Sequence, residues 1–94
     1  MFEWDPRKAE VDAAKHRVTF DDAVTVFLDP EALDGPALQH SSGESGFRRL
    51  GRSADGRALM VAYALRRSGD AEAIQIISAR RASRRERAAY GAKD

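Results

Sequence analysis

Residues 57–66 read RALMVAYALR, the clearest strand pattern in the chain. One face of such a strand carries Leu59, Val61, Tyr63 and Leu65, and alanine and methionine alternate with them on the other. A strand that is apolar on both faces belongs in the middle of a sheet, with helices covering at least one side. The pattern therefore predicts a central strand at 57–66.

Two further strands are expected beside this one. Residues 47–52 precede a Ser-Ala-Asp-Gly turn at 53–56, and residues 72–79 follow a turn predicted at Ser68-Gly69. Consecutive strands that are joined by short turns form an antiparallel meander. The C-terminal half is therefore predicted to supply most of the sheet.

The N-terminal half is expected to be mainly helical. After a short strand at residues 2–4, Asp5-Pro6 is typical of a helix N-cap and first helical position, and this helix should run to about His16. A second helix is predicted after Thr19, which precedes an aspartate in capping-box spacing. Its apolar face is expected to hold Phe20, Ala23, Val24, Phe27 and Leu28.

Two elements complete the predicted fold. Residues 31–38 contain a Gly-Pro pair and are expected to form a weak edge strand. Ser83 and Glu86 form a capping box that begins a last helix, which should reach about Tyr90. The fold class is therefore α+β, a small antiparallel sheet with two N-terminal helices and one C-terminal helix, in the order β-α-α-β-β-β-β-α. A chain of 94 residues is expected to form a single domain, 1–94.

Composition narrows the function classes. The chain has no cysteine, which excludes disulfides and thiolate zinc sites. Its start does not read as a signal peptide and no apolar run approaches the roughly 20 residues of a membrane span, so a cytoplasmic protein without membrane contact is expected. Residues 1–45 hold 10 acidic and 4 basic side chains, whereas 46–94 hold 5 acidic and 12 basic ones. The second half is therefore suited to a polyanion, although a solvated basic face has the same composition.

The densest basic segment is ARRASRRER, residues 79–87, with five arginines at the junction of the last strand and last helix. Cations at a helix N-terminus oppose the helix dipole, so the cluster is best explained by a phosphate bound there. A hairpin turning at Ser68-Gly69 would also place Arg57 opposite Arg80. An anion between these two arginines would relieve their repulsion, and Glu86 is the expected resting counterion.

Lys15 and His16 end the first predicted helix, where a protonated imidazole is favoured. Either side chain could act as the base or the acid of a ribonuclease without metal, although a helix-capping histidine is the simpler interpretation of His16 taken alone. His40 is expected in an exposed loop. The sequence shows no metal-ligand cluster and no glycine-rich phosphate loop, so neither a metal nor a cofactor is predicted.

Three blocks of the sequence together resemble the BrnT family of ribonuclease toxins. They are FEWDPRK at 2–8, KHRVTFDDA at 15–23 and IISARRASRRER at 76–87, and Gly56-Arg57 with the following strand is also similar. The resemblance implies a RelE-like fold and RNA cleavage that inhibits translation. It also implies neutralisation by a BrnA-type antitoxin, a ribbon-helix-helix protein through which DNA is bound indirectly in promoter autoregulation.

The residues and the resemblance together nominate a set of site residues. Those expected in catalysis are Lys15, His16, Arg57, Arg80 and Glu86. Those expected to bind RNA are Lys8, Arg48, Arg81, Arg84 and Arg85.

Two positions depart from the family pattern. Arg17 replaces the glycine that usually follows Lys-His, where a left-handed helix end would be strained for arginine. Gly46 stands where a basic residue is expected, and Arg48 or Arg49 is a candidate to compensate. These departures keep a second hypothesis open, a catalytically weak or inactive toxin-like module that acts with its antitoxin. A third is direct DNA binding through the basic last helix.

Overall fold

The computed structural model describes residues 1–36 and 46–91. Its elements are β1 (Phe2–Trp4), α1 (Pro6–His16), α2 (Phe20–Thr25), the 3-10 turn η1 (Val26–Leu28), β2 (Leu33–Pro36), β3 (Gly46–Arg52), β4 (Ala58–Ser68), β5 (Ala71–Arg81) and α3 (Arg84–Gly91). The predicted α+β fold and element order are confirmed. His40 and the end of the predicted 31–38 strand lie outside the described residues.

The five strands form one sheet in the order β1-β5-β4-β3-β2. β4 lies at its centre, as its two apolar faces predict. Strands β2 to β5 form the expected antiparallel meander. β1 pairs with β5 in parallel, which makes the sheet mixed rather than wholly antiparallel. Both short strands, β1 and β2, are edges.

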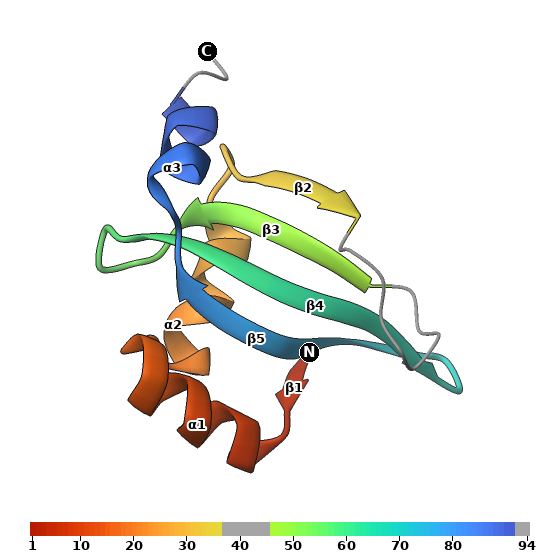
Figure 1. Ribbon diagram of the computed structural model, residues 1–94. Helices are drawn as coiled ribbons and strands as arrows, with labels where there is room; N and C mark the ends of the chain where they lie inside the picture. Colours follow the sequence, from red (N-terminus) through yellow and green to blue (C-terminus); the bar gives the residue numbers. More distant parts are fainter. Residues whose placement is uncertain (37–45, 92–94) are drawn as a thin grey trace.

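The main core lies between one face of the sheet and the first two helices (Figure 1). Val18, Phe20 and Val26 pack there against Leu59 and Val61, and all five side chains are buried. Asp5 and Thr19 cap α1 and α2 as predicted, since each side chain accepts a backbone N–H of the first turn. A smaller cluster, which includes Leu50 and Tyr90, lies under α3 on the other face.

Two apolar side chains that were predicted to face the core are exposed instead. Leu28 is 82% exposed, because the chain tightens into η1 after Thr25 and the 3-10 turn changes the direction of the side chain. Leu65 is 60% exposed, because the β4–β5 hairpin extends beyond the helices that cover the rest of β4 (Figure 1).

The predicted register of the β4–β5 hairpin is wrong. The turn falls at Gly69 and Asp70, since Ser68 pairs with Ala71, and this shift of one residue moves every cross-strand partner by two positions. An irregularity beside Ala62 and Tyr63 adds a further position. Arg80 therefore faces Met60, and Arg57 lies before the start of β4 rather than opposite Arg80.

Candidate RNA-binding site

A surface pocket lies where β3 ends, β4 begins and β5 passes into α3. Its volume is about 290 Å³. We call it the arginine pocket, lined by Arg52, Gly56, Arg57, Ala58, Arg81, Ala82, Arg87 and Tyr90. Four arginines around one hollow supply the kind of positive charge that binds a phosphodiester.

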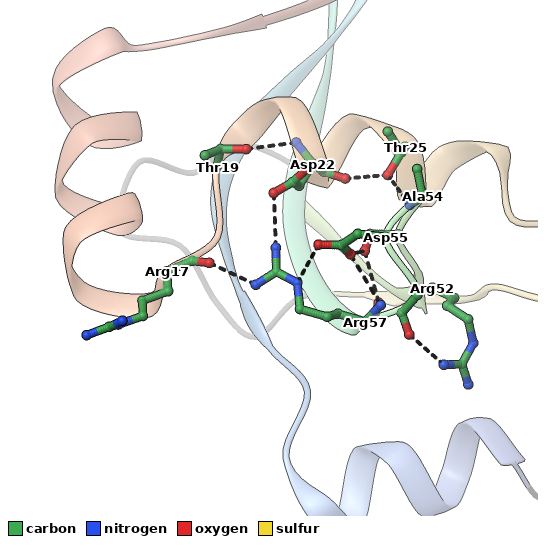
Figure 2. Close-up of polar contacts among 10 residues, drawn as sticks. Arg17, Thr19, Asp22, Thr25, Arg52, Ala54, Asp55 and Arg57 are labelled. Carbon is green, nitrogen blue, oxygen red and sulfur yellow. Dashed lines mark hydrogen bonds and ion pairs between the residues drawn. The ribbon is translucent and has the colours of Figure 1, made fainter.

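Arg57 is the most constrained of the four arginines. Its Nη1 donates to the Arg17 carbonyl at 2.8 Å, its Nη2 to Asp22 Oδ2 at 3.0 Å and its Nε to Asp55 Oδ2 at 2.8 Å. Figure 2 shows the guanidinium between the end of α1, the start of α2 and the β3–β4 turn. Arg57 therefore joins three segments and keeps its charge at the pocket wall.

The β3–β4 turn that carries Arg57 is fastened to α2. The Ala54 amide donates to Thr25 Oγ1 at 2.8 Å, and that hydroxyl donates to the Asp22 carbonyl at 2.6 Å (Figure 2). Asp55 accepts hydrogen bonds from the Ser53 hydroxyl and from Arg57, and these bonds lower the pKa of its carboxyl. Asp55 is thus an ionised counterion of Arg57 near neutral pH.

The opposite wall of the arginine pocket is built by α3. The Arg52 guanidinium lies 5.4 Å from the centre of the Tyr90 ring, and the Tyr90 hydroxyl donates to Asp29 Oδ2 at 2.6 Å. That hydrogen bond, together with burial, raises the pKa of Tyr90. Arg87 Nη1 donates to the Ala82 carbonyl at 2.9 Å and so holds the strand–helix junction.

Arg81 differs from the other three arginines of the pocket. Its side chain is exposed, and within residues 1–36 and 46–91 no carboxylate, carbonyl or aromatic ring binds its guanidinium. Its positive charge is therefore available to a ligand without the loss of an existing contact.

A second hollow lies on the other flank of α3, between that helix and the edge strand β2. We call it the α3 groove, lined by Leu33, Asp34, Gly35, Arg48, Leu50, Met60, Arg85, Glu86 and Ala89. Glu86 binds Arg80 through both oxygens, at 2.8 and 2.9 Å, and accepts the Ser83 amide at 2.8 Å. These bonds, Arg80 foremost, lower the pKa of Glu86 to about 2. The predicted capping box is present, and Glu86 is a counterion of Arg80 but not of Arg57, which pairs with Asp22 and Asp55.

The predicted site residues are thus divided rather than gathered. Arg57 and Arg81 line the arginine pocket, whereas Arg48, Arg85 and Glu86 line the α3 groove, with Arg80 bound to Glu86. The physical reason is the β4–β5 register. Arg80 faces Met60, whereas Arg57 lies before the start of β4. Exposed Arg84 lines neither hollow.

The end of α1 reaches the rim of the arginine pocket. Lys15 and His16 form its last turn, and the next residue is Arg17, whose carbonyl Arg57 holds. Lys8 lies farther back on α1 and binds Asp12 at 2.8 Å. Burial alone would raise the pKa of Asp12, but bonds from Lys8 and the Ala79 amide lower it. Asp12 therefore anchors α1 to β5, and Lys8 is its ion-pair partner within α1.

Three charged or aromatic residues of the arginine pocket were not predicted as site residues. Arg87 belongs to the basic segment 79–87, whereas Arg52 and Tyr90 stand at the ends of a strand and a helix. The one available signal was that Arg52 and Arg57 flank a four-residue turn, which brings both to the same end of the sheet.

The two departures from the family pattern, Arg17 and Gly46, lie at different distances from the arginine pocket. Arg17 does adopt the left-handed conformation, with φ of 59°, and its amide donates to the Ala13 carbonyl as a helix C-cap. Gly46 begins β3 at the end opposite Arg52, so its missing side chain lies about 20 Å along the strand from the arginine pocket. Arg48 lines the α3 groove and Arg49 is held by Asp34, so neither replaces a group in that pocket.

Two negative observations apply to the described part of the chain. Across residues 1–36 and 46–91, no three histidine or acidic side chains are grouped so that they could hold a metal ion. In the same segments, no helix has the length and apolar character to cross a bilayer.

Comparisons with known proteins agree with this architecture. The family model described as ribonuclease toxin, BrnT, of type II toxin–antitoxin system matches residues 4–86. The crystal structure of the Brucella abortus ribonuclease toxin BrnT is similar, with a TM-score of 0.61 and 24% sequence identity over 89% of this chain and 99% of that chain. A search of curated proteins found no match. At this identity the structural likeness shows the fold.

Proposed function

Because this chain belongs to the BrnT family of ribonuclease toxins, we propose that it cleaves RNA to inhibit translation and holds the scissile phosphodiester in the arginine pocket. The observation that carries the proposal is the presence of Arg52, Arg57, Arg81 and Arg87 around one hollow. Preorganised cations aimed at a phosphate stabilise the charge that develops in the transition state, which is commonly the largest catalytic contribution.

The proposed reaction needs no metal. The 2′-hydroxyl attacks the adjacent phosphorus as a base removes its proton, and the 5′-oxygen leaves with a proton from an acid. His16 and Lys15 are the proposed proton-transfer residues, because Arg57 ties the end of their helix to the pocket rim.

Arg80 and Glu86 receive a different role from the one expected at the outset. A carboxylate with a pKa of about 2 is a poor proton acceptor at neutral pH, and both of its oxygens are bound to Arg80. We therefore assign this pair to the support of the strand–helix junction. Lys8 and Arg84 remain proposed contacts for RNA outside the scissile phosphate, whereas Arg48 and Arg85, which line the α3 groove, are proposed contacts for a protein partner.

The partner that neutralises the toxin is proposed to be a BrnA-type ribbon-helix-helix antitoxin, as the toxin–antitoxin family implies. DNA would then be bound only through the antitoxin in the complex. Both the RNA substrate and the partner are expected in the cytoplasm. A small neighbouring gene for a ribbon-helix-helix protein would support this assignment.

The proposal is tested with purified protein and a labelled RNA of mixed sequence, in buffer with EDTA. Cleavage is expected to persist in EDTA, and His16→Gln or Lys15→Gln should slow it about 100-fold with the fold intact by circular dichroism. Cleavage that requires an added divalent ion would contradict metal independence. Unchanged activity in both variants would contradict their role in proton transfer.

A second function is favoured by one specific observation. The Arg57 guanidinium is already bound to Asp22, Asp55 and the Arg17 carbonyl, so phosphate must compete for it. If this competition fails, the chain is a catalytically inactive module that acts with its antitoxin in promoter autoregulation. That outcome would appear as no RNA cleavage and no growth arrest on expression, while promoter binding still requires both proteins.

A further inference from the structure

The α3 groove differs from the arginine pocket in what lies at its base. Leu33, Leu50 and Met60 are side chains on the face of the sheet opposite α1 and α2, and Ala89 adds an apolar wall from α3. Leu33 is 36% exposed on the edge strand, Met60 is half-buried and Leu50 is buried between them and α3, and the hollow measures about 320 Å³. Leu33 and Met60 therefore leave apolar surface open to solvent beside an edge strand of the sheet.

The α3 groove has more unpaired positive charge than unpaired negative charge among its described residues. Both of its carboxylates are already bound, Asp34 by Arg49 and Glu86 by Arg80. Arg48 and Arg85 are exposed, and within residues 1–36 and 46–91 neither guanidinium has a hydrogen-bond or ion-pair partner. The groove therefore presents two cations over an apolar floor, with no free anion of its own among the described residues.

This chemistry fits a protein segment better than a nucleic acid. Proteins that bind single strands of RNA stack the bases on aromatic side chains, and the described residues that line the groove include none. Apolar side chains at the centre with charges at the rim are instead typical of a groove that accepts an amphipathic peptide.

We propose that the α3 groove binds an acidic amphipathic segment of a partner protein, with carboxylates at Arg48 and Arg85 and apolar side chains over Leu33, Leu50 and Met60. This assignment rests on the proposed function, from which we infer that the segment belongs to the antitoxin. The antitoxin is then held on a different flank of α3 from the one that binds the scissile phosphate.

The chain offers a matched pair of variants for the test. Ala89 lines the groove and stands four residues after Arg85, so Ala89→Glu fills the hollow and pairs with that arginine. Ala88 is exposed outside the groove and stands four residues after Arg84, so Ala88→Glu makes the same change in charge and the same kind of helical pair.

The full chain is panned against a phage-displayed library of random 12-residue peptides, and the enriched peptides are synthesised for binding by fluorescence anisotropy. We expect acidic amphipathic peptides to be enriched, and their affinity to fall at least about tenfold in Ala89→Glu but less than about twofold in Ala88→Glu. No enrichment, enrichment of peptides without acidic and apolar residues, or equal loss in both variants would overturn the proposal.

Two further measurements separate this inference from the proposed nuclease. RNA cleavage is expected to be unchanged in Ala89→Glu, since the groove lies outside the arginine pocket. If a labelled RNA 15-mer loses affinity in Ala89→Glu but not in Ala88→Glu, the groove is an RNA site and the proposal is wrong. If the wild-type chain cleaves no RNA, the nuclease proposal fails while the peptide result still decides the groove.

Discussion

The two flanks of α3 both carry arginines, yet they are built differently. On one flank, Arg57 and Arg87 are hydrogen-bonded to surrounding carboxylate or carbonyl oxygens and Arg81 is left available. On the other, Arg80 is neutralised by Glu86, and Arg48 and Arg85 stand over apolar side chains. The number of positive charges is therefore a poor guide to what a surface binds. What lies between the charges, polar backbone or apolar floor, decides the kind of ligand.

Arg81 provides the strongest test of the difference between the two flanks. Arg81→Ala is expected to lower RNA cleavage about 100-fold, because it removes an available cation from the proposed site of the scissile phosphate. Arg7→Ala is the matched control, another exposed arginine that lines neither hollow and has no proposed RNA contact, and should change cleavage within about threefold. Initial rates on a short labelled RNA provide the measurement, and similar losses in the two variants would mean that the pocket does not hold the reacting phosphate.

A second test distinguishes the two flanks by stability. A Cβ at Gly51 would lie 2.8 Å from Val26 Cγ1 and 3.2 Å from Asp29 Oδ2, so Gly51→Ala should destabilise the fold by about 1–3 kcal/mol. Asp29 holds Tyr90, which makes the arginine pocket the side that is disturbed.

The control for this variant lies in the α3 groove. A Cβ at Gly35 would meet no atom within 4 Å, and Gly35→Ala should change the free energy of unfolding by less than about 0.5 kcal/mol. Urea denaturation measures both variants. If Gly51→Ala were as stable as the wild-type protein, β3 would have to be able to move away from η1.

The Arg80–Glu86 pair predicts a particular dependence on pH. The folded-state pKa of Glu86, about 2, lies below its ordinary value of 4.5, so its stabilising contribution is fully present above 4.5 and is lost as the pH falls through 2. Wild-type protein should thus lose about 1–2 kcal/mol more stability between pH 5 and 2 than Glu86→Gln.

Thermal unfolding across this pH range provides the comparison for Glu86. Glu10→Gln, an exposed carboxyl on α1, is the control and should follow the wild-type curve. Parallel curves for wild type and Glu86→Gln would show that the pair contributes little to the strand–helix junction.

The smallest expected effect is at the rim of the arginine pocket. Arg17 holds a left-handed conformation that glycine adopts without strain, so Arg17→Gly should raise stability by roughly 0.5–1 kcal/mol. Arg17→Ala keeps the strain and is the control. Because Arg57 binds the backbone carbonyl of Arg17, cleavage should be unchanged in both variants, and a large loss would assign a function to the Arg17 side chain.

Much of the fold followed from local patterns in the chain. Asp5, Thr19 and Ser83 mark the starts of helices because capping needs only a side chain and the next few amides. The two apolar faces of β4 indicated a central strand, since burial on both sides is recorded in alternation along the strand itself. The family resemblance also rested on the sequence alone and is confirmed by the family match.

The division of the arginines was decided only by the tertiary structure. A turn placed one residue later and one irregularity in the ladder put Arg80 opposite Met60 and left Arg57 with Asp22 and Asp55. Neither shift carries a strong sequence signal, because turn position and ladder irregularities depend on packing between distant segments. Local order is encoded within a few residues, whereas the partner of each charge is set by contacts across the whole sheet.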